Sequence, residues 1–145
     1  QRQEASSSDR ETARQLLSDA EMYMESRQFR EAAGAYHRAI ALYPDGAVYF
    51  AYARYLFRMN KLTMMEDSLE LAAGQGFDQA RIDYEMARLH GKLKQPYEAF
   101  QHLQSAVESG DFGREEIEEE RAFDVIRKSL VTRQEYKAFM SNLFY

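Results

Sequence analysis

Small and large apolar residues recur along this chain at a fixed spacing. In each of three segments, two small or flexible apolar residues stand twelve positions apart, and the pattern repeats after 33 or 34 residues. A larger apolar residue follows four positions later on the same helix face. The pattern predicts two helices per segment that cross at the small residues. The pairs are Ala20 with Ala32, Ala53 with Met65 and Ala87 with Ala99; the residues that follow are Tyr36, Leu69 and Leu103, then Ala39, Ala72 and Ala106.

Short polar residues precede several of the expected helices, as N-cap residues do. Asp45 and Asp78 stand before the third and fifth helices. Ser8 and Thr132 are each followed three residues later by Glu, which is the capping-box pattern. Residues 1–9 are expected to form a mobile tail. The helices are expected at residues 10–26, 28–42, 46–58, 61–74, 78–91, 96–109, 114–128 and 132–143.

The composition agrees with a helical globular domain. The chain has 145 residues, of which 45% are hydrophobic and 30% charged, which is enough to bury a core. It has only 7 Gly and 2 Pro, too few for the many turns of an all-β fold. We therefore expect an all-α fold.

Other compositional features exclude classes of function. The net charge of −5 argues against a nucleic-acid binder. Because there is no Cys, disulfides, thiol catalysis and Cys-based metal sites are excluded. No apolar run approaches about 18 residues, so no transmembrane segment is expected. The compartment stays open, since the chain fits a cytoplasmic protein or an exported one whose signal is absent from this chain.

The most complete repeat unit covers residues 13–46. Its pattern residues are Leu16, Ala20, Tyr23, Phe29, Ala32, Tyr36, Ala39, Ile40, Leu42 and Pro44. At these positions the sequence resembles the tetratricopeptide repeat family. The units 46–79 and 80–112 keep part of the pattern, and residues 72–76 resemble the unit ending of the related Sel1-like repeats. Residues 113–145 resemble the helices that cap such arrays.

This resemblance implies a fold and a domain organisation. It implies an α-solenoid, a right-handed superhelical array of antiparallel helix pairs with a C-terminal helical cap. Residues 10–145 would form one domain of three units and the cap. A stacked array needs such a cap because its last unit would otherwise expose an apolar face.

The resemblance also implies a concave groove lined by the first helix of each unit. The groove would carry an apolar stripe beside cations from the second and third units, with Glu21 and Glu25 at the first. Arg54, Arg58 and Arg88 could instead pair with Glu85 and other surface acids. The predicted groove residues are Arg14, Leu17, Glu21, Met24, Phe50, Arg54, Phe57, Arg58, Arg81, Tyr84, Arg88 and Lys92.

We expect from this groove a non-enzymatic adaptor or scaffold that binds a protein segment. The partner would be acidic, with one or two large apolar anchors. Leu17 and Glu21 stand where some relatives carry a Lys/Asn clamp for a C-terminal carboxylate, so that function does not carry over. The alternative is an assembly subunit that acts by self-association or through convex and terminal surfaces, including the apolar end Leu143-Phe144-Tyr145. A third hypothesis is a regulatory domain of a longer enzyme.

The sequence offers little for catalysis or metal binding. His37, His90 and His102 are not spaced as metal ligands, and no phosphate-binding loop or nucleophile motif is present. The glutamates of residues 115–120 are expected to form a solvated helix face. We therefore predict no catalytic residue, metal or cofactor.

Overall fold

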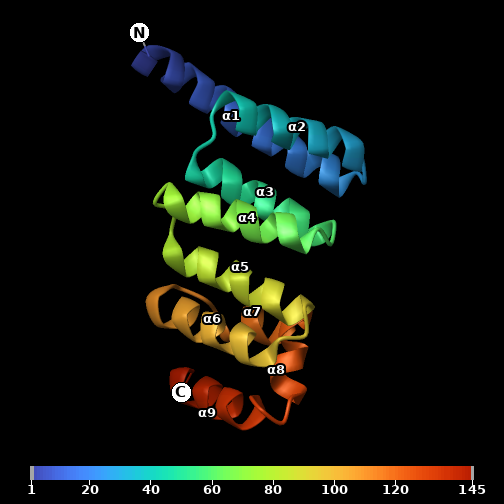
Figure 1. Ribbon diagram of the computed structural model, residues 1–145, viewed down its shortest axis with the longest axis vertical. Helices are drawn as coiled ribbons and strands as arrows, with labels where there is room; N and C mark the ends of the chain where they lie inside the picture. The colour runs from blue at the N-terminus through green and yellow to red at the C-terminus, as the bar shows by residue number, and fades with distance from the viewer. Residues whose placement is uncertain (1, 145) are drawn as a thin grey trace. The chain divides into compact units, whose positions relative to one another are not determined.

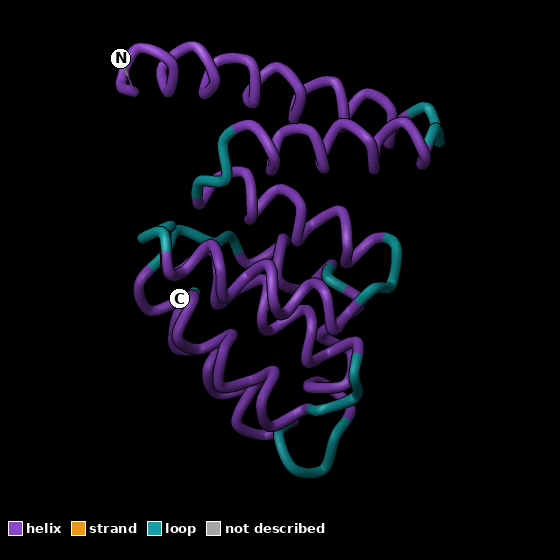
Figure 2. The backbone as a smooth tube through the Cα atoms, turned by 45° about the horizontal axis from the view of Figure 1, so that its top comes forward, coloured by secondary structure: helices purple, strands orange, loops and turns teal. Residues whose placement is uncertain are grey.

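The computed structural model describes residues 2–144, with side chains from residue 7 onward, and they are almost entirely helical. Helices account for 81% of the chain, and the described residues contain no strand. Short turns join consecutive helices (Figure 2). The expected all-α class is therefore confirmed. The chain divides into two compact units, Gln1–Phe77 (unit 1) and Asp78–Tyr145 (unit 2).

Unit 1 consists of two helix hairpins. Helix α1 packs along α2, and α3 packs along α4 (Figure 1). Contacts of α3 with both α1 and α2 join the two hairpins. The helices are α1 (Arg2–Glu25), α2 (Phe29–Leu42), α3 (Gly46–Arg58) and α4 (Leu62–Gly74).

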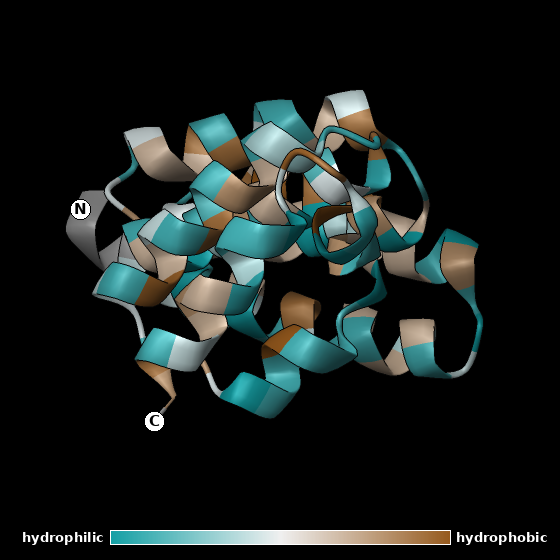
Figure 3. Ribbon diagram, turned by 90° about the horizontal axis from the view of Figure 1, so that it is seen from below, coloured by the Kyte–Doolittle hydropathy of each residue, from teal (hydrophilic) through white to brown (hydrophobic). Residues whose placement is uncertain are grey.

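Unit 2 has one hairpin and a set of shorter helices that cover it. Helices α5 and α6 form the hairpin, and α8 and the 3-10 helix η1 pack against it. Hydrophobic and hydrophilic residues both occur along the helices (Figure 3), and most of the buried residues of α5 and α6 are apolar. The elements are α5 (Gln79–Lys92), α6 (Pro96–Ser109), α7 (Arg114–Glu119), η1 (Arg121–Phe123), α8 (Asp124–Lys128) and α9 (Arg133–Leu143).

The repeating small residues lie where the two helices of each hairpin meet. All six are fully buried, and so are the alanines that recur later in each segment, Ala39, Ala72 and Ala106. Tyr36, Leu69 and Leu103 are buried beside them. The sequence pattern therefore identifies the core of all three hairpins correctly, and it does so within each unit separately.

The turns inside the hairpins repeat with the same period. Arg27, Asn60 and Lys94 have positive φ angles of 61°, 58° and 62°. At each turn, the next residue's N–H bonds a carbonyl five positions back, as in a Schellman C-cap. This left-handed conformation usually selects Gly, so these three residues carry conformational strain.

Of the four predicted N-caps, Asp45 and Asp78 are confirmed, Ser8 is wrong, and Thr132 stands at the N-cap of α9 without a side-chain capping bond. Asp45 accepts a hydrogen bond from the Val48 N–H at 3.0 Å, and Asp78 accepts one from the Ala80 N–H at 3.1 Å. Ser8 is no cap, because α1 already begins at Arg2 and continues through it. The buried Thr132 hydroxyl donates instead to the Ile126 carbonyl at 2.7 Å, which ties the start of α9 to α8.

The expected helix at 114–128 is instead three pieces. Glu120 has an extended backbone between α7 and η1, with φ −74° and ψ 112°. Its carboxylate accepts a hydrogen bond from the Ala122 N–H at 3.0 Å and pairs with Arg88 of α5. These contacts favour a break that the helical periodicity of this segment did not indicate. The early start of α1 likewise differs from the expected boundary at residue 10, while the mobility of residues 1–9 stays a prediction.

Candidate functional site

Most of the predicted apolar stripe belongs to the core. Met24, Phe50, Phe57 and Tyr84 are all buried. In unit 1 the Phe50 ring stacks on Phe77, with ring centroids 4.6 Å apart. These four side chains are therefore not exposed anchors for a partner, which corrects the sequence-based expectation.

Tyr84 in unit 2 shows how completely such a residue is enclosed. Its ring stacks on Phe112 with centroids 4.6 Å apart and meets Phe123 edge to face at 5.5 Å. Burial raises the pKa of its phenol, Glu116 and Glu120 raise it further, and Arg88 opposes them. The ring and its hydroxyl thus serve the packing of unit 2.

Two predicted groove residues on α1, Leu17 and Arg14, already make contacts within unit 1. Leu17 is half-buried against the cluster of Ala13, Ala39 and Val48 that joins α1, α2 and α3. Arg14 is exposed and lies 3.9 Å from the carboxylate of Asp45, the N-cap of α3. Exposed pairs of this kind contribute at most about 1 kcal/mol.

The charged groove residues of unit 1 gather around one tyrosine. Arg54 and Arg58 are exposed one turn apart on α3, and Glu21 is exposed on α1. Burial raises the pKa of Tyr36 on α2; Glu21 raises it further, while Arg54 and Arg58 lower it. All three charges therefore lie near the Tyr36 hydroxyl, and α1 and α3 are in contact. We name Glu21, Glu25, Arg54 and Arg58 the α1–α3 face; Glu25 is also exposed.

Arg88 in unit 2 is committed to ion pairs inside its own unit. Its guanidinium lies 2.6 Å from Glu85 and 2.7 Å from Glu120, and its side chain is only 17% exposed. Burial opposes its charge, but the two carboxylates raise its pKa. The alternative that Arg88 pairs with Glu85 is thus confirmed, and Arg88 is removed from the partner-binding set. Arg81 and Lys92 remain exposed on α5.

An aromatic cluster that the sequence did not indicate lies between α2 and α3. The Tyr36 and Tyr55 rings are 4.9 Å apart, and Tyr52 stacks on Tyr55 at 5.8 Å. His37 contacts the Tyr52 hydroxyl at 3.2 Å through Nε2. The cluster is consistent with a packing role for most of the aromatic residues.

Two histidines that are distant in sequence meet across the α5–α6 hairpin. The His90 and His102 rings are stacked with centroids 5.2 Å apart. His90 Nδ1 lies 2.6 Å from the amide oxygen of Gln95, and His102 Nδ1 lies 3.4 Å from Asp83. They stand twelve positions apart, which is also the spacing of the small-residue pairs in each hairpin. That spacing could therefore have located this contact. Within residues 2–144, no three His, Asp or Glu side chains are grouped as metal ligands.

The acidic segment and the chain end also have definite places. The glutamates at positions 115, 116, 118 and 119 are exposed, as expected for a solvated face, whereas Glu120 is half-buried beside Arg88. Phe144 packs against the core cluster of unit 2, so that part of the apolar end folds back. Tyr145 lies outside the described residues.

Together these observations define an all-helical protein built from repeated helix hairpins, with charged residues grouped on its surface. No helix in the described part of the chain is both long and apolar enough to cross a membrane. Comparison with family models, curated proteins and solved structures finds no match to this chain.

Proposed function

We propose that the chain is a non-enzymatic protein-interaction module of the tetratricopeptide type, whose hairpins stack in a right-handed superhelical array. Its α1–α3 face would bind an acidic segment of a partner protein. The observation that carries the proposal is the pair of exposed arginines, Arg54 and Arg58, one turn apart on α3, which together with Glu21 on α1 influence the pKa of Tyr36.

The chemistry of this face favours carboxylates. Arginine presents a planar fork of N–H donors that bonds a carboxylate at two points, and two such forks on one helix face can hold two acidic side chains. Glu21 and Glu25 would repel acidic residues at the α1 end and favour a basic one. The partner segment would therefore bind in one direction. Since most of the apolar stripe is buried, charge contributes more to this binding than apolar anchors do.

The proposal is tested by reversing the two charges on α3. The variant Arg54→Glu with Arg58→Glu should bind a fluorescent acidic peptide at least about tenfold more weakly than the wild type. The matched control is Arg30→Glu with Arg38→Glu, which makes the same charge change at exposed positions of α2. Fluorescence anisotropy measures both at low and high salt, because exposed ion pairs are screened over about 8–10 Å.

The expected result is loss of affinity and of salt dependence in the α3 variant alone. Affinities of both variants that equal the affinity of the wild type would exclude the α1–α3 face as the site. An equal loss of affinity in both variants would show that only the overall charge of the chain matters. Circular dichroism establishes that each variant retains its helices.

A further inference from the structure

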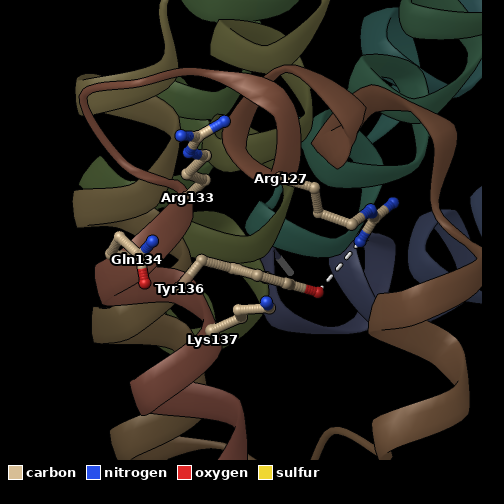
Figure 4. A pocket seen from close by; sticks show the side chains of 5 residues that line it. All are labelled: Arg127, Arg133, Gln134, Tyr136 and Lys137. Atoms are coloured by element: carbon tan, nitrogen blue, oxygen red, sulfur yellow. Dashed lines mark hydrogen bonds between the residues drawn. The ribbon is translucent and has the colours of Figure 1, made fainter.

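Unit 2 contains a pocket that the sequence did not indicate. It lies between α8 and α9 and has a volume of about 400 Å³. Arg127 extends into it from α8, and the other lining side chains belong to the first turns of α9 (Figure 4). The lining residues are Arg127, Arg133, Gln134, Tyr136 and Lys137.

Arg127 supplies charge to this pocket, but its donors are already in use. Its guanidinium donates to the carbonyl oxygens of Ile117 and Glu120, to the carboxylate of Asp124 and to the hydroxyl of Tyr136. The side chain is thereby fixed in one position on the pocket wall. A ligand would experience its positive charge without displacing its hydrogen bonds.

Three further side chains of the pocket, Arg133, Tyr136 and Lys137, can donate as well, and Gln134 carries both an amide donor and an amide acceptor. The Tyr136 oxygen accepts a hydrogen bond from Arg127 at 2.9 Å, which leaves its own O–H to donate elsewhere. Arg133 and Lys137 are exposed one turn apart on α9, and among the described residues neither forms an ion pair. Three cations and a phenol thus line the pocket, and this chemistry suits an oxyanion such as a carboxylate.

The charge of this region contrasts with that of the whole chain. Residues 121–137 contain five Lys and Arg against two Asp and Glu, whereas the chain carries a net charge of −5. Cations therefore outnumber acids in this segment of the cap. Asp124 offsets Arg127, but no carboxylate lines the α9 side of the pocket.

An exposed apolar tip immediately precedes α9. Leu130 is 80% exposed and Val131 is 64% exposed, in the turn between α8 and α9. They are among the most exposed large hydrophobic residues of the described chain. These two side chains offer a small apolar contact surface directly before the cations of α9.

We propose that this pocket and the adjoining tip bind an acidic segment of a partner protein, with one carboxylate between Arg133 and Lys137 and one apolar side chain against Leu130 and Val131. The surface lies in unit 2 and shares no residue with the α1–α3 face, so it stands or falls independently of that proposal.

A peptide fits this surface better than an anionic membrane does. Arg127 bonds directly to the carbonyls of Ile117 and Glu120, so the exposed acids Glu118 and Glu119 lie close to the pocket along the chain. A flat anionic bilayer presents many charges at once, and like charges repel, so these glutamates oppose it more than they oppose a segment with a single carboxylate.

The test uses two short peptides with blocked termini that differ in one residue type: one contains Leu and Glu, the other Leu and Gln. Binding is measured by the backbone amide NMR shifts of the protein. The Glu peptide should shift the amides of residues 130–137, and the Gln peptide should not. The variant Arg133→Gln with Lys137→Gln should weaken binding of the Glu peptide at least about tenfold. Leu130→Ser with Val131→Ser should weaken it severalfold, because the apolar contact is lost.

The matched control is Arg38→Gln with Lys94→Gln, which removes one Arg and one Lys at exposed positions outside the pocket. It should bind the Glu peptide like the wild type. Unchanged melting temperatures would show that the variants fold, as their exposed positions predict. Shifts centred on α1 and α3 alone would support the function proposed above and overturn this one.

Three further results would overturn the inference. Equal shifts with both peptides would show that the carboxylate is not recognised. Binding of phosphatidylserine vesicles without binding of the Glu peptide would assign the surface to a membrane. Concentration-dependent shifts of residues 130–137 in the absence of peptide would assign it to a second copy of this chain.

Discussion

The two units contain the same kind of helix hairpin but cover it in different ways. In unit 1 a second hairpin packs against the first, and the helices meet through apolar residues such as Ala13, Ala39 and Val48. In unit 2 four short helical elements cover one hairpin, and arginines enter the packing. The difference follows from the number of helix ends, because each end leaves backbone groups without helical partners.

The polar contacts of unit 2 meet this need. Arg127 bonds the carbonyls of Ile117 and Glu120 near the end of α7, and Thr132 bonds the carbonyl of Ile126 in α8. Among the described residues, every fully buried side-chain N or O atom has a hydrogen-bond partner. Unit 1 needs fewer such contacts because it has fewer helix ends. Unit 2 should therefore be the more sensitive unit to single substitutions.

The largest effect is expected at Gly91 on α5. An added Cβ would lie 2.0 Å from the carbonyl oxygen of Ala122 in η1, and neither backbone can move without disrupting the unit. Gly91→Ala should lower the free energy of unfolding by about 3 kcal/mol or more. The control is Gly34→Ala on α2, where an added Cβ meets nothing within 4 Å. That variant should gain about 0.5–1 kcal/mol.

Urea unfolding followed by circular dichroism measures both glycine variants. A similar effect of the two substitutions would contradict the close approach of α5 and η1. It would also remove the contrast between a tightly covered hairpin in unit 2 and an open helix surface in unit 1.

The next effect concerns the arginine that joins the short helices. Arg127→Met keeps an apolar side chain of similar length but leaves two carbonyls without their donor. The free energy of unfolding should fall by about 2–3 kcal/mol. Arg127→Lys should restore only part of it, since an ammonium cannot reproduce the fork. The exposed Arg38→Met on α2 should change it by less than about 0.5 kcal/mol, and equal losses would refute the assigned role.

The third prediction asks where the two units should behave alike. Ala32 in unit 1 and Ala99 in unit 2 are both fully buried at equivalent helix crossings. Substitution of either by Leu should cost about 1–3 kcal/mol through overpacking. Ala41→Leu, at an exposed position of α2, serves as the control in thermal melts. Unchanged melting of Ala32→Leu would show that the repeat register is wrong.

The sequence was most informative where local pattern and packing agree. The columns of small residues and the Asp45 and Asp78 caps follow from spacing and side-chain chemistry alone, and the structure confirms them. The period places each hairpin correctly because every hairpin buries the same positions. This part of the fold needs no knowledge of contacts between distant residues.

Prediction was poorer where distant residues decide the local structure. Glu120, at the break, pairs with Arg88 of α5, and Thr132 bonds a carbonyl in the preceding helix. Neither partner is visible in a local pattern. The candidate site was affected in the same way: Phe50 and Tyr84 were assigned to a surface, but Phe77 and Phe112 cover them. The charged residues fared better: those of the α1–α3 face keep the exposure that binding requires, as do Arg14, Arg81 and Lys92.

The fourth prediction concerns high pH and the buried phenols of the two units. Burial raises the pKa of Tyr84 and of Tyr36 above the ordinary value, which is about 10. Above pH 10 the unfolded chain therefore loses these protons while the folded chain keeps them, so stability falls as pH rises. Each buried tyrosine adds a slope of up to about 1.4 kcal/mol per pH unit.

Substitution by Phe separates the two phenols. Tyr84→Phe keeps the ring stacked on Phe112 and should flatten the fall in stability between about pH 10 and 12, as measured by urea unfolding at several pH values. Tyr36→Phe should flatten it less, because two arginines lower the pKa of Tyr36, whereas Arg88 alone lowers that of Tyr84 against Glu116 and Glu120. A profile unchanged by Tyr84→Phe would show that this phenol is accessible to solvent.

The smallest effect is expected at the turns, where substitution should stabilise the protein. Arg27 and Lys94 have positive φ angles of 61° and 62°, a region in which a side chain is strained and Gly is not. Arg27→Gly in unit 1 and Lys94→Gly in unit 2 should each raise the free energy of unfolding by about 0.5–1 kcal/mol. The gain should be similar in both units because the turns have the same hydrogen bonds. The control is Arg38→Gly within α2, which should instead lose about 1 kcal/mol, as Gly does in a helix interior. A loss at all three positions would show that Arg27 and Lys94 make side-chain contacts that outweigh the strain of their backbone. The difference in sign between Arg27→Gly and Arg38→Gly therefore isolates the turn conformation from the loss of the arginine side chain.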